Sequence, residues 1–128
     1  MSYHFSTTLR GDFDAVVTRV IEALGKEGFG VLTDIDIAAT LKKKLDVDFR
    51  PYRILGACNP PLAWQALQME DKIGTMLPCN VIVQETAPQS IEVSAVDPAA
   101  SMQAVANPAL ADLAKTVQYK LRTVIDSL

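Results

Sequence analysis

Two apolar runs joined by a short turn constrain the fold of this chain more than any other feature. The runs are Cys79–Thr86 and Ile91–Val96, and the residues between them are Ala87-Pro88-Gln89-Ser90. Valine and isoleucine, which favour strands, dominate both runs, and the connecting segment has the residues of a turn. The pattern predicts a β-hairpin, and therefore a sheet with antiparallel neighbours.

Three further segments have strand patterns. Residues 2–10 alternate loosely between apolar and polar side chains, and Phe29–Asp36 resumes the alternation after a glycine. A third strand is expected over Tyr52–Cys58, directly after Pro51, because proline is tolerated at the start of a strand. These segments add to the sheet that the hairpin begins.

Four segments have helical patterns, with apolar residues at three- and four-residue spacing. The expected helices cover residues 13–24, 37–45, about 60–70 and 108–128. Asp12, Asp36 and Asn59 precede the first three as capping residues, and Asn107-Pro108 repeats the start signal of Asn59-Pro60. The last helix has the longest apolar stripe.

The order of these elements predicts an α+β fold. Helices pack against a single, mostly antiparallel β-sheet, in a β-α-β-β-β-β-α core with short inserted helices. We find no linker, repeat or low-complexity segment, so residues 1–128 are expected to form a single domain. At 128 residues the chain is long enough to bury one ordinary hydrophobic core.

Charge and hydropathy exclude several classes of partner. The net charge of −3 opposes attraction to phosphate, and we therefore expect no nucleic-acid partner. The basic run Lys42-Lys43-Lys44 is interpreted as a solvated helix face. No apolar run approaches the roughly 18 residues of a membrane span, and the N-terminus MSYHFSTTLR lacks the pattern of a signal peptide. We expect a cytoplasmic protein with no membrane partner.

The two cysteines, Cys58 and Cys79, are the candidate reactive groups. Cys58 lies just before the helix that Asn59 caps, where partial positive charge favours a thiolate. Pro60 and Pro61 lack N–H groups, so the effect is expected to be modest. Cys79 starts a strand with no basic neighbour in sequence and is expected to be the less activated thiol. Burial as small apolar side chains is the alternative interpretation for both.

A metal or cofactor site is not expected. The chain has one histidine, His4, and no CxxC spacing, so a site made of both cysteines and one carboxylate would be sparse. A histidine-based catalytic triad is equally hard to assemble. General acid–base chemistry would fall to carboxylates.

Four polar residues are candidate ligand-binding residues: Asn59, Glu70, Asn80 and Asp97. Asn59 has helix capping as its simpler role. Asn80 lies in a strand pattern, where asparagine is depleted, so its amide is expected to bond a loop or a ligand. Glu70 and Asp97 are placed toward the same end of the sheet as Cys79, with exposed surface carboxylates as the alternative.

Three motifs identify a family resemblance: LGACNPPLA at 55–63, IGTMLPCNVIV at 73–83 and VDP at 96–98. With the order of elements, they resemble the DUF302 family of small bacterial and archaeal proteins over nearly the whole chain. The resemblance implies a TATA-binding-protein-like α+β fold and a homodimer. It implies no defined activity, because the family has none.

We therefore expect a cytoplasmic homodimer that holds a small ligand near Cys58, Glu70 and Cys79. The alternative is a thiol-dependent sulfur-transfer or redox enzyme in which Cys58 attacks and Cys79 resolves. A pure interaction protein is the third class, which would show an apolar surface patch instead of a pocket. The ligand-binding protein and the thiol-dependent enzyme both require Cys58 and Cys79 to lie beside one accessible hollow.

Overall fold

Five strands form one antiparallel sheet in the structure, a computed structural model that describes residues 2–128. The strands are β1 (His4–Arg10), β2 (Gly30–Asp36), β3 (Tyr52–Cys58), β4 (Cys79–Ala87) and β5 (Ser90–Val96). Their spatial order is β1-β5-β4-β3-β2, so β1 and β2 form the two edges. Neighbouring strands are antiparallel throughout, which confirms the predicted α+β fold class.

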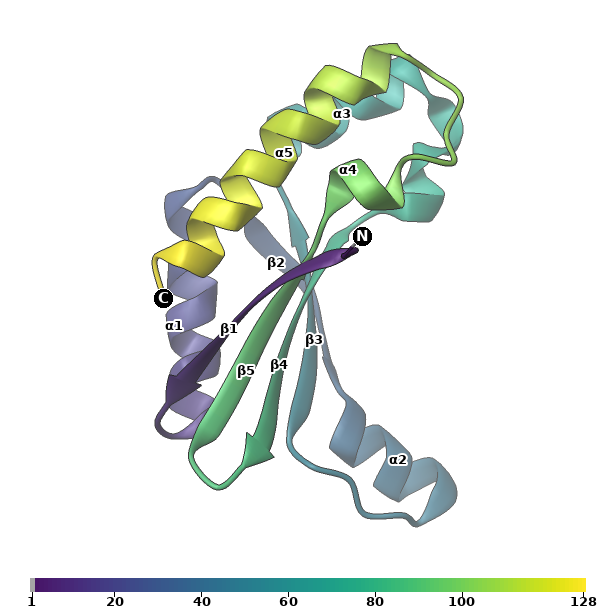
Figure 1. The fold of residues 1–128 in the computed structure, drawn as a ribbon. Coiled ribbons are helices and arrows are strands. Elements are labelled where there is room, and N and C mark those ends of the chain that lie inside the picture. The colour runs from purple at the N-terminus through teal and green to yellow at the C-terminus, as the bar shows by residue number, and fades with distance from the viewer. Residues whose placement is uncertain (1) are drawn as a thin grey trace.

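The helices are α1 (Phe13–Lys26), α2 (Ile37–Leu45), α3 (Pro60–Met69), α4 (Pro98–Ser101) and α5 (Ala109–Asp126), with a 3-10 helix η1 (Asp71–Met76). Figure 1 shows the C-terminal half of α5 beside α1 and its N-terminal half beside α3. The short helix α2 lies away from the others, at the far end of β2 and β3 (Figure 1). The helices α1 and α5 thus cover one face of the sheet.

The hairpin forms as predicted, with β4 and β5 paired from Val81↔Ala95 to Ala87↔Ser90. Other boundaries differ slightly from the sequence prediction. β1 starts at His4 rather than residue 2, and α3 ends at Met69, after which η1 continues the chain. Local patterns predict that an element exists better than they predict its last turn.

The start of α5 also differs in detail. The helix begins at Ala109, and its N-cap position is Pro108, which makes no side-chain cap hydrogen bond. Asn107 takes over the capping bond, because its Oδ1 accepts from the Ala109 backbone N–H at 3.1 Å. The helix α5 therefore begins two residues after its capping asparagine, whereas α3 begins one residue after Asn59.

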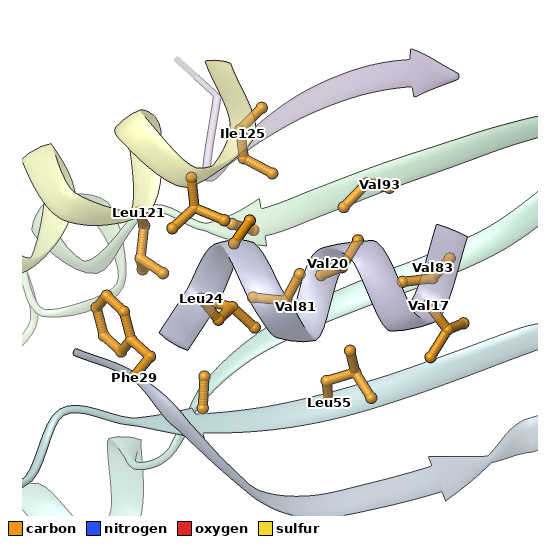
Figure 2. Packing of buried hydrophobic residues seen from close by; sticks show 14 of the residues in the cluster. Val17, Val20, Leu24, Phe29, Leu55, Val81, Val83, Val93, Leu121 and Ile125 are labelled. Atoms are coloured by element: carbon orange, nitrogen blue, oxygen red, sulfur yellow. The ribbon is translucent and has the colours of Figure 1, made fainter. Parts of the chain in front are cut away.

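The main core lies between the sheet and the helices α1 and α5. Inward-facing residues alternate along the central strands and are fully or nearly fully buried: Leu55, Ala57, Val81, Val83, Val93 and Ala95. Figure 2 shows Val20 and Leu24 of α1 packed over Val81, with Leu121 and Ile125 of α5 beside them. Each buried valine or leucine side chain contributes roughly 1.5–3 kcal/mol when it leaves water.

A second, smaller cluster lies beyond the end of the sheet. Ala66 of α3, Ile73 of η1 and Leu110 of α5 are buried together, and Leu77, Met102, Val105 and Leu113 pack around them. The first half of α5 thus belongs to a different cluster from its second half. A single helix joins the two clusters.

Gly56 allows three segments to meet on the other face of the sheet. A Cβ atom at this position would lie 2.7 Å from Pro78 Cγ and closer still to Thr33 Oγ1. Thr33 is the β2 partner of Gly56, and Asn80 is its β4 partner. Only a residue without a side chain lets β2 and the segment before β4 approach β3 this closely.

We expect Gly56→Ala to lower the free energy of unfolding by about 1–3 kcal/mol, the usual cost of forcing atoms into a packed site. Gly25→Ala is the matched control, because nothing lies within 4 Å of a Cβ there and alanine favours the helix α1. Urea denaturation of both variants measures the difference. Equal stability of the two variants would show that the contacts around Gly56 are looser than described.

Candidate functional site

An apolar cavity of about 40 Å³ lies where the two hydrophobic clusters meet. Phe29, Ala57 and Cys79 line it from the main cluster, and Ala66 and Leu110 line it from the smaller one. No charged side chain of residues 2–128 contributes to the lining. The site is therefore an apolar compartment next to the end of β3 and the start of β4.

Both cysteines line this cavity. Cys79 pairs with Ala57 across β3 and β4, so Cys58 is the next residue along β3. Strand alternation would turn Cys58 toward the opposite face, but Cys58 is the last residue of β3 and still reaches the cavity. Both thiols are free; Cys58 is half-buried, whereas Cys79 is buried with 7% of its surface exposed.

The two thiols differ in their electrostatic surroundings. Burial raises the pKa of the Cys79 thiol to about 11, and the nearby Cys58 adds to the rise. A thiol with this pKa is ionised in about one molecule per thousand at pH 8. Cys79 is therefore a protonated thiol at neutral pH, and Cys58 is the more accessible of the two.

Asn59 has a structural role at the rim of the cavity. Its Oδ1 accepts from the Leu62 N–H at 3.5 Å and caps α3, and its Nδ2 donates to the Glu27 carbonyl at 3.3 Å. The side chain thus ties the start of α3 to the loop after α1. It also lines the cavity.

Glu70 and Asp97 do not line the cavity with Cys79. Glu70 ends α3, and its Oε1 accepts from Asn107 Nδ2 at 3.5 Å. Asp97 caps α4 through the Ala99 and Ala100 N–H groups and accepts from Gln118 Nε2 at 3.0 Å. The register Val81↔Ala95 places Asp97 at the same end of the sheet as Cys79, but both carboxylates hold helix ends and neither lines the cavity.

Asn80 lies on the face of the sheet opposite the cavity. It is exposed and follows Cys79, whose side chain faces the core, so alternation turns Asn80 outward. Its amide makes no side-chain hydrogen bond with residues 2–128. The structure therefore brings together Cys58, Cys79 and Asn59, and separates them from Glu70, Asn80 and Asp97.

Met102 and several α5 residues form the part of the site that sequence reasoning missed. Met102, Leu110 and Ala114 line both the cavity and a neighbouring open groove of about 600 Å³ between the segment after α4 and α5. The apolar stripe of α5 signalled burial, but it does not distinguish residues in a packed core from residues beside a cavity. Met102 had no sequence signal.

Across positions 2–128, no group of three His, Cys, Asp or Glu side chains is placed to hold a metal ion. In the same range, no helix has the length and apolar character needed to cross a bilayer.

Comparisons with known proteins identify a family and a similar solved structure. Residues 5–128 match the family described as "Domain of unknown function DUF302". The crystal structure of an uncharacterized conserved DUF302 protein from Bacillus stearothermophilus has 27% sequence identity and a TM-score of 0.90, and the alignment covers 98% of each chain. A comparison with curated proteins found no match.

We expect iodoacetamide at pH 8 to label Cys58 in the native protein and to leave Cys79 unmodified until denaturant is added. A thiol whose pKa rises from 9.0 to about 11 has roughly a hundredfold less thiolate at this pH, and burial further restricts access. Peptide mass spectrometry over time measures both sites, with Cys58→Ser as the control that removes native labelling. Equal rates at the two sites would contradict the burial of Cys79.

Proposed function

We infer the function of this chain from its own cavity, because the chain belongs to the DUF302 family, which is described only as a domain of unknown function. We propose that it binds a small, uncharged, mostly apolar ligand beside Cys58 and Cys79. The observation that carries this proposal is the composition of the lining, which contains apolar side chains, two thiols and one amide but no charge. A charged ligand would be desolvated there without a partner.

The cavity volume limits what fits without movement. One water molecule occupies roughly 10–15 Å³ on this scale, so 40 Å³ holds only a few ligand atoms. A larger ligand requires Met102 to move, since this residue lies between the cavity and the groove. Methionine is flexible and adapts its shape at low cost, which makes it a suitable movable partition.

A thiol-dependent reaction is the second candidate, supported by the two cysteines lining the same cavity. In this alternative Cys58 is the attacking group, because it is half-buried, and Cys79 is the resolving group, which must first lose its proton to become the attacking thiolate. A cytoplasmic location would keep both thiols reduced between cycles. The labelling experiment above distinguishes the two candidates, since an unreactive Cys58 leaves only ligand binding.

We propose in addition that a second copy of the chain covers α2 and the outer edge of β2. α2 has no buried residue, and the exposed apolar side chains of this region, which we call the α2 patch, are Ile35, Leu45, Val47 and Phe49. β2 is an edge strand whose outer side pairs with no other strand of residues 2–128. An unpaired edge beside apolar side chains is suited to association.

Charge supports pairing of the α2 patch with itself. Lys43 and Lys44 lie next to Asp46 and Asp48, so both signs occur within a few residues. In a two-fold dimer the same surface meets itself, and a patch with both signs can place unlike charges opposite each other. A homodimer through this patch leaves the cavity on the helical face accessible.

Filling the cavity is expected to abolish ligand binding. Ala63 lines the cavity and is half-buried, so Ala63→Leu places extra carbon atoms inside it. We expect 1-hexanol, as a neutral apolar probe, to shift the NMR signals of Ala66 and Val117 in the parent protein and not in this variant.

Ala15→Leu, at an exposed position of α1 outside both the cavity and the α2 patch, is the matched control and is expected to bind hexanol like the parent. Hexanol shifts that persist in Ala63→Leu would show that the probe binds elsewhere. A parent protein whose spectrum hexanol leaves unchanged would also contradict the proposal.

A charge in the α2 patch is expected to separate the dimer. Leu45 is 66% exposed, and Leu45→Glu places a carboxylate where two copies would meet. Sedimentation equilibrium is expected to give a dimer for the parent and a monomer for this variant. Tyr119→Glu, at a similarly exposed apolar residue on α5, is the control and is expected to remain a dimer.

A further inference from the structure

A second hollow, of about 330 Å³, lies on the face of the sheet that α1 and α5 leave uncovered. Its floor includes Ile82 of β4 and Val96 of β5, and its sides include Tyr52 of β3 and Tyr3, which precedes β1. Asn80, Ser94 and His4 complete the polar part of the lining. The volume falls within the usual range for small-molecule sites, unlike that of the cavity beside the cysteines.

The serine side chains of β1 and β5 leave room on this face of the sheet. Ser6 of β1, Ser94 of β5 and Ile82 of β4 lie in one row across the strands. The larger rings of Tyr3 and Tyr52 line the sides of the hollow beside Ser94 and Ile82.

A hydrogen-bonded chain fixes the polar groups on one side of the hollow. His4 Nδ1 lies 2.8 Å from Ser6 Oγ, which lies 2.7 Å from Ser94 Oγ. The Tyr3 ring packs edge-on against the His4 ring, with centroids 4.9 Å apart. Because Nδ1 is engaged by Ser6, the Nε2 atom of His4 is available to a ligand.

Asn80 supplies a donor on the other side. Its exposed amide makes no hydrogen bond to side chains of residues 2–128, so the amide N–H groups are open to a ligand. Ser94 is 8% exposed and is the one buried polar residue of the described chain. Asn80 thus supplies a donor on one side of an apolar floor, and one end of the His4–Ser6–Ser94 chain, either His4 Nε2 or Ser94 Oγ, supplies a donor on the other.

The hollow lacks acidic side chains. No Asp or Glu of residues 2–128 lines it, and Glu92, the next outward-facing residue of β5, accepts a hydrogen bond from Gln84 Nε2 at 3.0 Å. An anion in the hollow therefore meets donors without a facing carboxylate. The aromatic side walls and the apolar floor fit a flat, carbon-rich body.

We propose that this hollow binds a small carboxylate with a flat apolar body, such as an aromatic acid. The carboxylate accepts hydrogen bonds from Asn80 and from the His4–Ser6–Ser94 chain, and the body lies between Tyr3 and Tyr52 over Ile82. The site is separate from the cavity beside Cys58 and Cys79, because the two lie on opposite faces of the sheet. It is also separate from the proposed contact through the α2 patch, which involves the β2 edge.

Benzoate is the probe for this site, and benzamide is its neutral analogue of the same shape. Titration of the full chain, followed by amide NMR signals, is expected to show benzoate shifts at Asn80, Ile82, Ser94 and Val96. Benzamide is expected to bind at least about tenfold more weakly, since hydrogen bonds to a charged group are the stronger ones. Equal binding of the two probes would overturn the carboxylate assignment.

Two variants test the residues. Asn80→Ala and Ser94→Ala are each expected to weaken benzoate binding about tenfold, whereas Ser90→Ala, on the same face of β5 but outside the hollow, leaves it unchanged. The amide spectra of the free proteins show that each variant is folded. Benzoate shifts that are absent, that cluster around Ala63 instead, or that survive both substitutions would overturn the proposal.

Discussion

The inward face of β3, β4 and β5 is the surface on which the rest of the structure depends. Its alternating apolar side chains must be covered, and α1 and α5 cover it together (Figure 2). Leu121, Val124 and Ile125 attach only the C-terminal half of α5 to this surface. The N-terminal half of α5 extends beyond the sheet and packs against α3. The cavity lies between the part of α5 that covers the sheet and the part that does not.

The sequence predicted the elements well because their signals are local. The turn between β4 and β5, the cap at Asn59 and the apolar stripe of α5 each lie within a few residues, and each is found in the structure. Helix ends were less accurate, since η1 and the shifted start of α5 depend on contacts with other segments. Such contacts leave no pattern in a short window of sequence.

The candidate site was predictable only in part, for the same reason. Asp97-Pro98 has the local signature of a helix cap, and the structure uses it as one, but its bond to Gln118 joins distant segments. Cys58 and Cys79 lie beside one cavity because β3 and β4 are neighbours in register. Ser6 and Ser94 likewise meet only through pairing of β1 with β5, which explains why their hydrogen-bonded chain had no sequence signal.

The smaller hydrophobic cluster has a consequence for how the molecule opens. It contains three buried residues, against a much larger set in the main core, so less apolar surface holds α3, η1 and the first turns of α5 in place. Amide hydrogens in these segments are then expected to exchange through partial opening, while those of β4 and β5 exchange only when the whole chain unfolds. Cys58 and Cys79 lie where these two parts of the molecule meet. Partial opening of α3 and η1 would therefore expose both thiols while β4 and β5 stay folded.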